Sequence, residues 1–231
     1  MKYVFGFFAF IFMSNLYGYS FRECEPNRLF IAPVYKSNKW IFEDVPRENL
    51  WGGMIGFEHL RENDIFARVI GAEASGKTGS LWFDHFWNVE GEVGYTWGCN
   101  GFFATPYVGV GFIYDQEPNF DSVIWKEFSY YLPFGLLLGY DFSCDWTLML
   151  RSQGNYIFSN RVTRGNTPFS ATNVTFWLFE LPVTWRFYSN LDLSFVPTYS
   201  YTPQMDLSGS DGLTWANQST WGGRIELGYR W

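Results

Sequence analysis

The sequence is poor in histidine, cysteine and basic residues. Its 231 residues include only two histidines and three cysteines, and the net charge is −7. Because lysine and arginine form no cluster, a nucleic acid partner is not expected. No group of histidines and cysteines has metal-ligand spacing, and we predict neither a metal nor another cofactor. Beyond residue 20, no apolar run is long enough to form a membrane-spanning helix.

Aromatic residues, by contrast, are abundant. They make up 23% of the chain, with 25 Phe, 15 Tyr and 12 Trp, which is far too many for a disordered protein. Many of the 23 glycines fall inside apolar alternating segments rather than in turns. Membrane-spanning barrels need aromatic girdles at two interfaces, and small residues suit the interior of a narrow barrel. The composition therefore favours a β-barrel with one polar face and one apolar face.

The first 20 residues have the pattern of a secretory signal peptide. Lys2 supplies a positive charge, an apolar segment runs from Tyr3 to Met13, and Gly18-Tyr19-Ser20 offers a cleavage site between small residues. We therefore expect an exported protein that begins near Phe21 and has one domain at 21–231.

The last segment of the chain alternates strictly between apolar residues and small or charged ones. Its apolar members are Ile225, Leu227, Tyr229 and Trp231. In a strand these side chains share one face. This aromatic ending resembles the C-terminal signal of bacterial outer-membrane β-barrels, which the barrel-assembly machinery reads. The resemblance implies a protein held in the lipid of the outer membrane of a Gram-negative-type bacterium.

The same alternation recurs through the mature sequence and predicts ten strands. We expect them at 28–35, 50–58, 65–73, 86–97, 102–114, 126–142, 146–158, 172–188, 191–201 and 217–231. Short connections alternate with long ones, which is typical of a closed antiparallel transmembrane barrel with short periplasmic turns and long extracellular loops. The chain thus resembles small outer-membrane barrels of the ten-stranded, omptin-sized class, although it is not a clear omptin.

Charged residues are confined to the strand face opposite the aromatic one. A charge that faces lipid at mid-membrane costs about 2–4 kcal/mol, so we place these residues in the lumen. Since buried charges persist only when they are paired, we predict an ion-paired network that stiffens the barrel. Its members are Arg28, Glu58, Arg68, Glu90, Glu92, Glu127, Asp141, Arg151, Glu180, Arg186, Arg224, Glu226 and Arg230.

Two sets of residues do not fit this simple pattern. Proline cannot donate a ladder hydrogen bond and normally marks an edge or a bulge, yet five prolines fall inside the predicted strands. They are Pro33, Pro106, Pro133, Pro182 and Pro197. Cys24, Cys99 and Cys144 are expected on the periplasmic side, where an odd number leaves one thiol for an intermolecular cross-link. Whether two of them form an internal disulfide stays open.

Two motifs suggest chemistry. Residues 71–78 match the P-loop pattern, but no helix is expected after them, and a phosphate site needs a helix N-terminus. We interpret this segment as part of an outward-facing loop. Asp84 and His85 are candidate catalytic residues, since an Asp can orient a His as a general base. Omptin proteases carry an Asp pair and an Asp-His pair at the extracellular rim, but neighbouring strand residues such as Asp84 and His85 point to opposite faces.

These observations favour a structural or adhesin-like surface-contact role without enzymatic activity. The five long loops offer a surface for an unidentified ligand. The alternatives are a narrow diffusion channel for small solutes and, third, a rim hydrolase that uses His85. A ten-stranded lumen is only slightly wider than an eight-stranded one, whose interior side chains fill it, so a large pore is not expected. The sequence leaves the oligomeric state open.

Overall fold

The computed structural model describes residues 25–40, 47–78, 82–118, 124–164, 167–169, 174–203, 205–206, 214–215 and 217–231. The expected signal peptide and Cys24 lie outside these residues. The strands are β1 (Asn27–Trp40), β2 (Glu48–His59), β3 (Asp64–Thr78), β4 (Trp82–Cys99), β5 (Phe102–Pro118), β6 (Ile124–Asp141), β7 (Trp146–Arg164), β8 (Thr167–Phe169), β9 (Val174–Glu180), β10 (Val183–Tyr188), β11 (Leu191–Thr202), β12 (Met205–Asp206), β13 (Thr214–Trp215) and β14 (Gln218–Arg230). Within the described ranges, no helix is long and apolar enough to cross a membrane.

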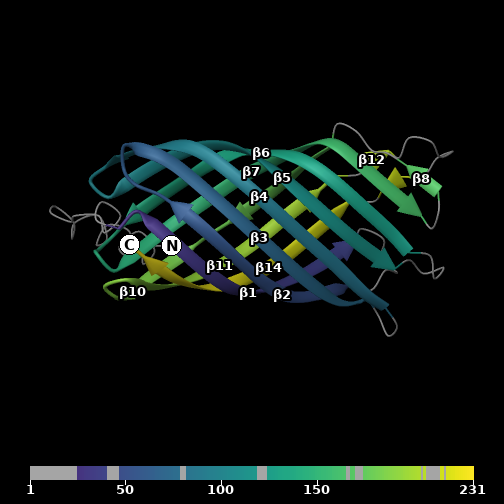
Figure 1. Ribbon diagram of the computed structural model, residues 1–231, viewed down its shortest axis with the longest axis horizontal. Coiled ribbons are helices and arrows are strands. Elements are labelled where there is room, and N and C mark those ends of the chain that lie inside the picture. Colours follow the sequence, from purple (N-terminus) through teal and green to yellow (C-terminus); the bar gives the residue numbers. More distant parts are fainter. Residues whose placement is uncertain are drawn as a thin grey trace, which may run out of the picture.

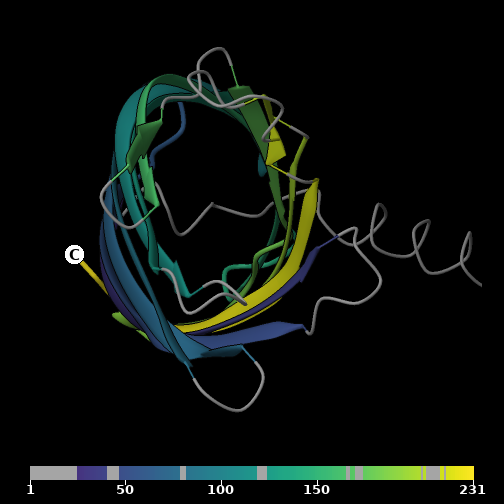
Figure 2. The same cartoon turned by 90° about the vertical axis from the view of Figure 1, so that its right-hand side faces the viewer.

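The strands form a closed antiparallel barrel (Figures 1 and 2). Strands β1 to β7 pair in sequence order, β9 and β10 together occupy the next position, and β11 and β14 follow. The ring closes where β14 pairs with β1. Because the ring is closed, the described part of the barrel has no edge strand. The prediction of an all-β, ten-stranded closed barrel is confirmed.

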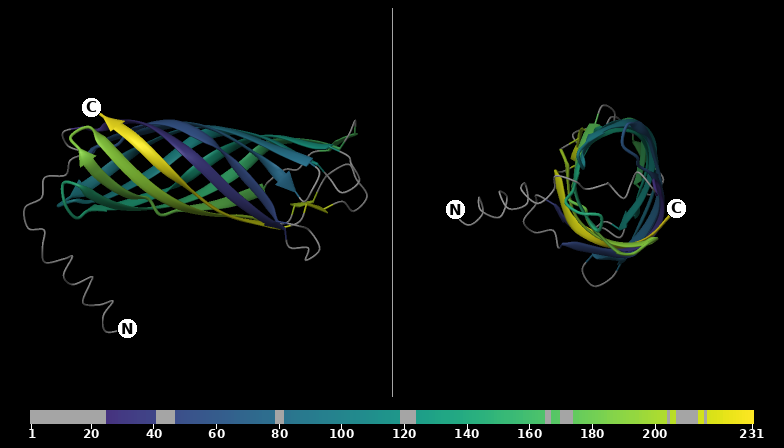
Figure 3. Two further views of the ribbon diagram at one scale, coloured as in Figure 1. Left: turned by 90° about the horizontal axis from the view of Figure 1, so that it is seen from below. Right: turned by 90° about the vertical axis from the view of Figure 1, so that its left-hand side faces the viewer.

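The two ends of the barrel differ. At one end, here called the turn end, short connections at 60–63, 100–101, 142–145 and 189–190 join the strands. The hairpin at Asn100 and Gly101 has φ angles of 54° and 80°, which the Asn-Gly pair adopts readily. The C-terminus also lies at this end (Figure 3), where Asn27 and Trp231 exchange backbone hydrogen bonds of 3.3 and 3.2 Å. The opposite end is the loop end.

Strands on one side of the barrel extend much further toward the loop end. Strands β4 to β7 contain 18, 17, 18 and 19 residues, whereas β1, β2, β11 and β14 contain 14, 12, 12 and 13. Several predicted strands were therefore too short. The expected loop at 74–85, for example, is strand at 74–78 and 82–85. The prediction failed there because polar and glycine residues suggested a turn, while cross-strand hydrogen bonds continue regardless of polarity.

The barrel has its apolar surface outside and its polar surface inside. Large aromatic and aliphatic side chains on all barrel strands are exposed, among them Trp51 (65%) and Val110 (63%). Charged side chains of the alternate parity are buried in the lumen, such as Arg28, which is only 3% exposed. A water-soluble barrel would have the opposite arrangement, whereas a lipid-facing one requires this arrangement.

Each in-strand proline lies at an interruption of the ladder with one neighbouring strand. At Pro106, the β4–β5 pairs stop at Tyr107 and resume at Ala104. Equivalent interruptions occur at Pro33, Pro133 and Pro197. Pro182 separates β9 from β10, so the predicted continuous strand at 172–188 was wrong at this point. Since proline lacks an N–H group, each interruption omits a bond that it could not donate.

Four lumen aromatics each cover a glycine on the neighbouring strand. The direct cross-strand pairs are Phe30 with Gly56, Tyr131 with Gly111, Phe103 with Gly139 and Tyr107 with Gly135. A Cβ at any of these glycines would overlap the facing ring. Glycine therefore makes room for large rings inside a narrow barrel. In the turn half, Phe103 packs with Leu60, Phe66, Tyr107, Leu137 and Met149 in one buried cluster, here called the plug.

Candidate functional site

The lumen holds most of the predicted charge network, beginning near the turn end. Arg28 on β1 donates to Asp192 on β11 at 2.6 Å and to Glu226 on β14 at 2.5 Å. Arg230 donates to the other oxygen of Asp192 at 2.5 Å. Because these strands flank the β1–β14 junction, the ion pairs connect the two strands that close the ring. Ser194 accepts a further hydrogen bond from Arg28.

A second set of ion pairs crosses the barrel at mid-height. Arg224 donates to Glu226 at 2.7 Å and to Glu180 at 2.5 Å. Glu180 also lies 3.5 Å from Arg151, which pairs in turn with Glu90 and Glu92. The network therefore runs without a break from β14 through β9 and β7 to β4.

Arg68 on β3 is attached only weakly to this network. Its Nη1 atom lies 3.8 Å from Oε2 of Glu92, which is beyond hydrogen-bonding distance. Its Nε and Nη1 atoms have no hydrogen-bond partner within the described part of the chain, although the residue is only 5% exposed. Burying donors without hydrogen-bond acceptors is costly, so Arg68 has capacity for a further acceptor.

Arg186 occupies a different place from the other predicted network members. It lies at the turn end, where it donates to Glu25 at 2.5 Å and to the backbone oxygen of Ser189. Glu127 is held by Ser129 and Asn160 nearer the loop end. Arg186 and Glu127 therefore stand apart from the main network, in which Glu226 links Arg28 to Arg224.

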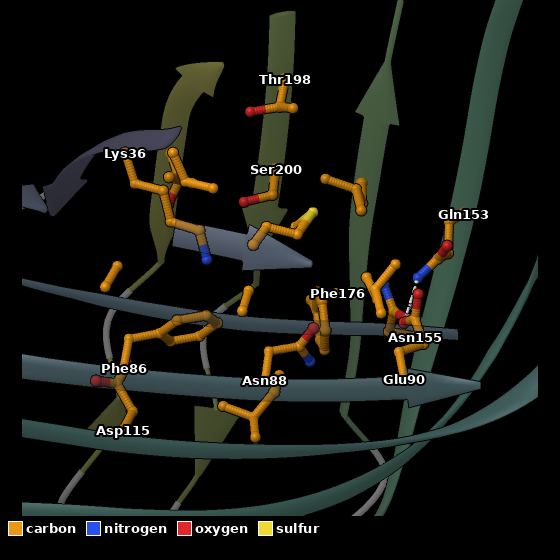
Figure 4. Close-up of a pocket in the computed structure, with 18 of the residues that line it drawn as sticks. Lys36, Phe86, Asn88, Glu90, Asp115, Gln153, Asn155, Phe176, Thr198 and Ser200 are labelled. Atoms are coloured by element: carbon orange, nitrogen blue, oxygen red, sulfur yellow. Dashed lines mark hydrogen bonds between the residues drawn. The ribbon is translucent and has the colours of Figure 1, made fainter. Parts of the chain in front are cut away.

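A cavity of about 210 Å³ lies above the mid-height network, toward the loop end; it is here called the cup. Its floor contains Arg68, Glu90, Arg151, Glu180 and Arg224. The close-up shows Lys36 beside Phe86 on one side and Gln153, Asn155 and Glu90 on the other (Figure 4). The Lys36 ammonium lies 3.4 Å from the centre of the Phe86 ring, as in a cation–π contact.

Below the network, the described side chains enclose a small pocket of about 30 Å³ between the plug and the ion pairs. That volume accommodates about one water molecule. Cup and turn end are thus separated by packed side chains.

His85, one of the two candidate catalytic residues, lies on the outward face of β4. Its ring shares the outward face with Trp87, whose indole N–H donates to it at 2.5 Å, and Glu73 lies 3.6 Å away. Asp84 is in β4, on the opposite parity, and its side chain lies outside the description. Among the described residues, no group of His, Cys, Asp and Glu could hold a metal ion.

The structure also shows where the P-loop match and two of the three cysteines lie. Residues 71–78 belong to β3, so the expectation of a loop there was wrong. The next described residues, from Trp82, are again a strand and not a helix. Cys99 and Cys144 are exposed at the turn end and are not disulfide-bonded to each other.

The side chains of the C-terminal pattern all face outward. Ile225, Leu227, Tyr229 and Trp231 are exposed on β14 and just after it. The Trp231 ring stacks on Tyr229 with a centroid distance of 6.0 Å and lies 6.1 Å from Phe57. Tyr229, Trp231 and Phe57 therefore form an aromatic patch at the turn end.

The fold of this chain is similar to that of several solved membrane barrels. The translocator domain of the autotransporter NalP from Neisseria meningitidis aligns with a TM-score of 0.51 and 11% identity, over 89% of this chain and 88% of that one. The chain has the fold of an outer-membrane β-barrel. Neisserial surface protein A (TM-score 0.46, 10% identity, 89% and 97% coverage) and OprG from Pseudomonas aeruginosa (0.40, 10%, 89% and 96%) are also similar. No family model and no curated protein matches the chain.

Sequence reasoning missed the cup. Alternation assigns Gln153 and Asn155 to the lumen face, but it does not show at which height the lumen is filled. That depends on the stagger between strands, which sets which side chains meet across the barrel. The pairing of an aromatic with a glycine does not mark that height either, because Tyr131, which covers Gly111, itself lines the cup.

Proposed function

We propose that this protein is an integral outer-membrane barrel with a closed lumen, which acts through surface contacts at its loop end. In this arrangement the turn end faces the periplasm and the loop end faces outward. Solute passage and catalysis are not its role. Residues Ile225, Leu227, Tyr229 and Trp231 serve as its signal for the barrel-assembly machinery.

The plug is the observation that carries this proposal. Phe103 is fully buried and lies over Gly139, while Met149 on β7 and Leu60 in the β2–β3 connection pack in the same cluster. The ion pairs of Arg151 and Arg224 lie directly above. A solute would have to displace an apolar cluster and a charged layer together, and each is costly to disrupt. The outward position of His85 further supports a role without catalysis.

The test is single-channel conductance of the refolded protein in a planar bilayer. We expect the unmodified barrel to be silent. The double variant Phe103→Ala/Met149→Ala removes much of the plug and should produce openings. The control Phe102→Ala/Leu150→Ala truncates the adjacent outward-facing side chains and should stay silent. Steady openings of the unmodified barrel would instead support the narrow diffusion channel.

A further inference from the structure

We propose that the cup binds a small neutral molecule with a mainly apolar body and one hydrogen-bond-acceptor oxygen. This inference rests on the proposed function in one respect, since it requires the lumen to be closed beneath the cup. The cup, at about 210 Å³, is larger than an apolar cavity of roughly 150 Å³ that holds benzene in another protein. A ligand of roughly eight to ten non-hydrogen atoms fits this volume.

The walls of the cup select an apolar body. Leu50 and Met54 from β2, Ile70 from β3, and Phe176 and Leu178 from β9 line it on facing sides. Water forms no hydrogen bonds with these apolar side chains. An aromatic or branched aliphatic group, by contrast, has a lower free energy there than in water. Small-molecule sites typically combine walls of this kind with a few fixed polar groups.

The polar groups without partners in the cup are donors. Asn155 is fully buried; its Oδ1 atom accepts from Gln153 at 2.7 Å, while its Nδ2 atom has no hydrogen-bond partner among the described residues. At the floor, Arg68 keeps two unpaired N–H-bearing atoms. Both side chains line the cup. A ligand oxygen that accepts from one of them, after a small rotation of that side chain into the cup, removes the cost of an unpaired donor.

The charge balance of the cup selects a neutral ligand. Its charged lining residues nearly balance, with Lys36, Arg68, Arg151 and Arg224 against Glu73, Glu90, Asp115, Glu127 and Glu180. At the floor, Arg151 and Arg224 are already ion-paired, with Glu90 and Glu180 among their partners. A charged ligand would enter a site whose charges are already nearly matched and would have to be desolvated without a counter-ion. A carbonyl or ether oxygen offers the acceptor without that penalty.

Three probes of equal non-hydrogen size separate these requirements. Acetophenone carries a neutral acceptor, cumene replaces the carbonyl group by an apolar branch, and benzoate carries a full charge. Binding to the refolded full-length protein in micelles is measured by titration calorimetry, with the heats of empty micelles subtracted. We expect acetophenone to bind about tenfold more tightly than cumene, as one satisfied buried donor implies, and benzoate to bind more weakly than acetophenone.

Two variants locate the binding. Asn155→Leu removes a donor at similar volume and should lower the acetophenone affinity while leaving that of cumene unchanged or higher. Damage to the fold would lower both. Ala72→Phe fills the cup and should abolish binding of every probe, whereas Ala104→Phe makes the same change on the outer face and should not.

Three outcomes overturn the proposal. Equal binding of acetophenone and cumene would leave only an apolar cavity, and tightest binding of benzoate would indicate an anion site. Binding of none of the three would indicate that water completes the unpaired donors. A barrel that conducts refutes the closed lumen, whereas a silent barrel that binds no probe refutes this inference alone.

Discussion

The ring of Phe103 on β5 covers Gly139, its direct cross-strand partner on β6, so closely that no other residue fits at position 139 without displacing the ring. The pair lies in the plug, where Phe103 is fully buried. It shows how a narrow barrel admits large aromatics: one strand supplies the ring and its neighbour supplies the space. The solidity of the plug therefore depends on a residue without a side chain.

Gly139→Ala should destabilise the barrel by about 1–3 kcal/mol, the usual cost of overpacking a filled interior. The matched control is Gly91→Ala on β4, because a Cβ there meets nothing within 4 Å. Urea unfolding in micelles, followed by tryptophan fluorescence, measures both. Equal stability of the two variants would contradict the close fit between Phe103 and Gly139.

Asp192→Asn should weaken the closure of the ring. The Asp192 carboxylate is fully buried and accepts from both Arg28 and Arg230, and removing one member of a buried charge network costs about 3–5 kcal/mol. The heat-induced mobility shift on electrophoresis should occur at a clearly lower temperature. Asp145→Asn, an exposed turn residue, should behave as the unmodified protein. A network of no energetic importance would leave both variants alike.

Val110→Arg tests whether the apolar outer surface faces lipid. Val110 lies near the middle of β5 and is largely exposed, so an arginine there should cost about 2–4 kcal/mol in a bilayer. The folded fraction after refolding into lipid vesicles should fall. Ser159→Arg, near the loop end of β7 and next to the exposed Arg161, should fold normally. Equal folded fractions would place this surface in water.

Strand parity was the part of the fold that could be predicted from sequence. The alternation around Glu90 and Glu92, or around Arg224 and Glu226, correctly identified the face that lies in the lumen, because one slip in parity would put charge into lipid. The turns at Asn100 and Ser189 were also predictable, since their chemistry is local. The in-strand prolines did not fit the predicted closed barrel, because the sequence does not show that each strand is locally unpaired from one of its two neighbours at its proline.

Partner choice within the lumen could not be predicted. Arg28 meets Asp192, which is 164 positions away, and nothing local to either residue encodes that contact. Asp192 was absent from the predicted network, although its parity on β11 allows it. Arg186 was included, yet it pairs with Glu25 beyond the strand ends. Such contacts depend on the stagger of the closed ring, which is a property of all ten strands together.

The uneven strand lengths have a consequence for how the loop end presents itself. Strands β4 to β7 remain hydrogen-bonded to one another along nearly their full length of 17 to 19 residues. The upper part of this wall is therefore a shaped surface held by backbone hydrogen bonds, whose form does not depend on the sequences of the connecting segments. The connecting segments at the loop end could therefore differ in sequence without changing the shape of the sheet that β4 to β7 form there.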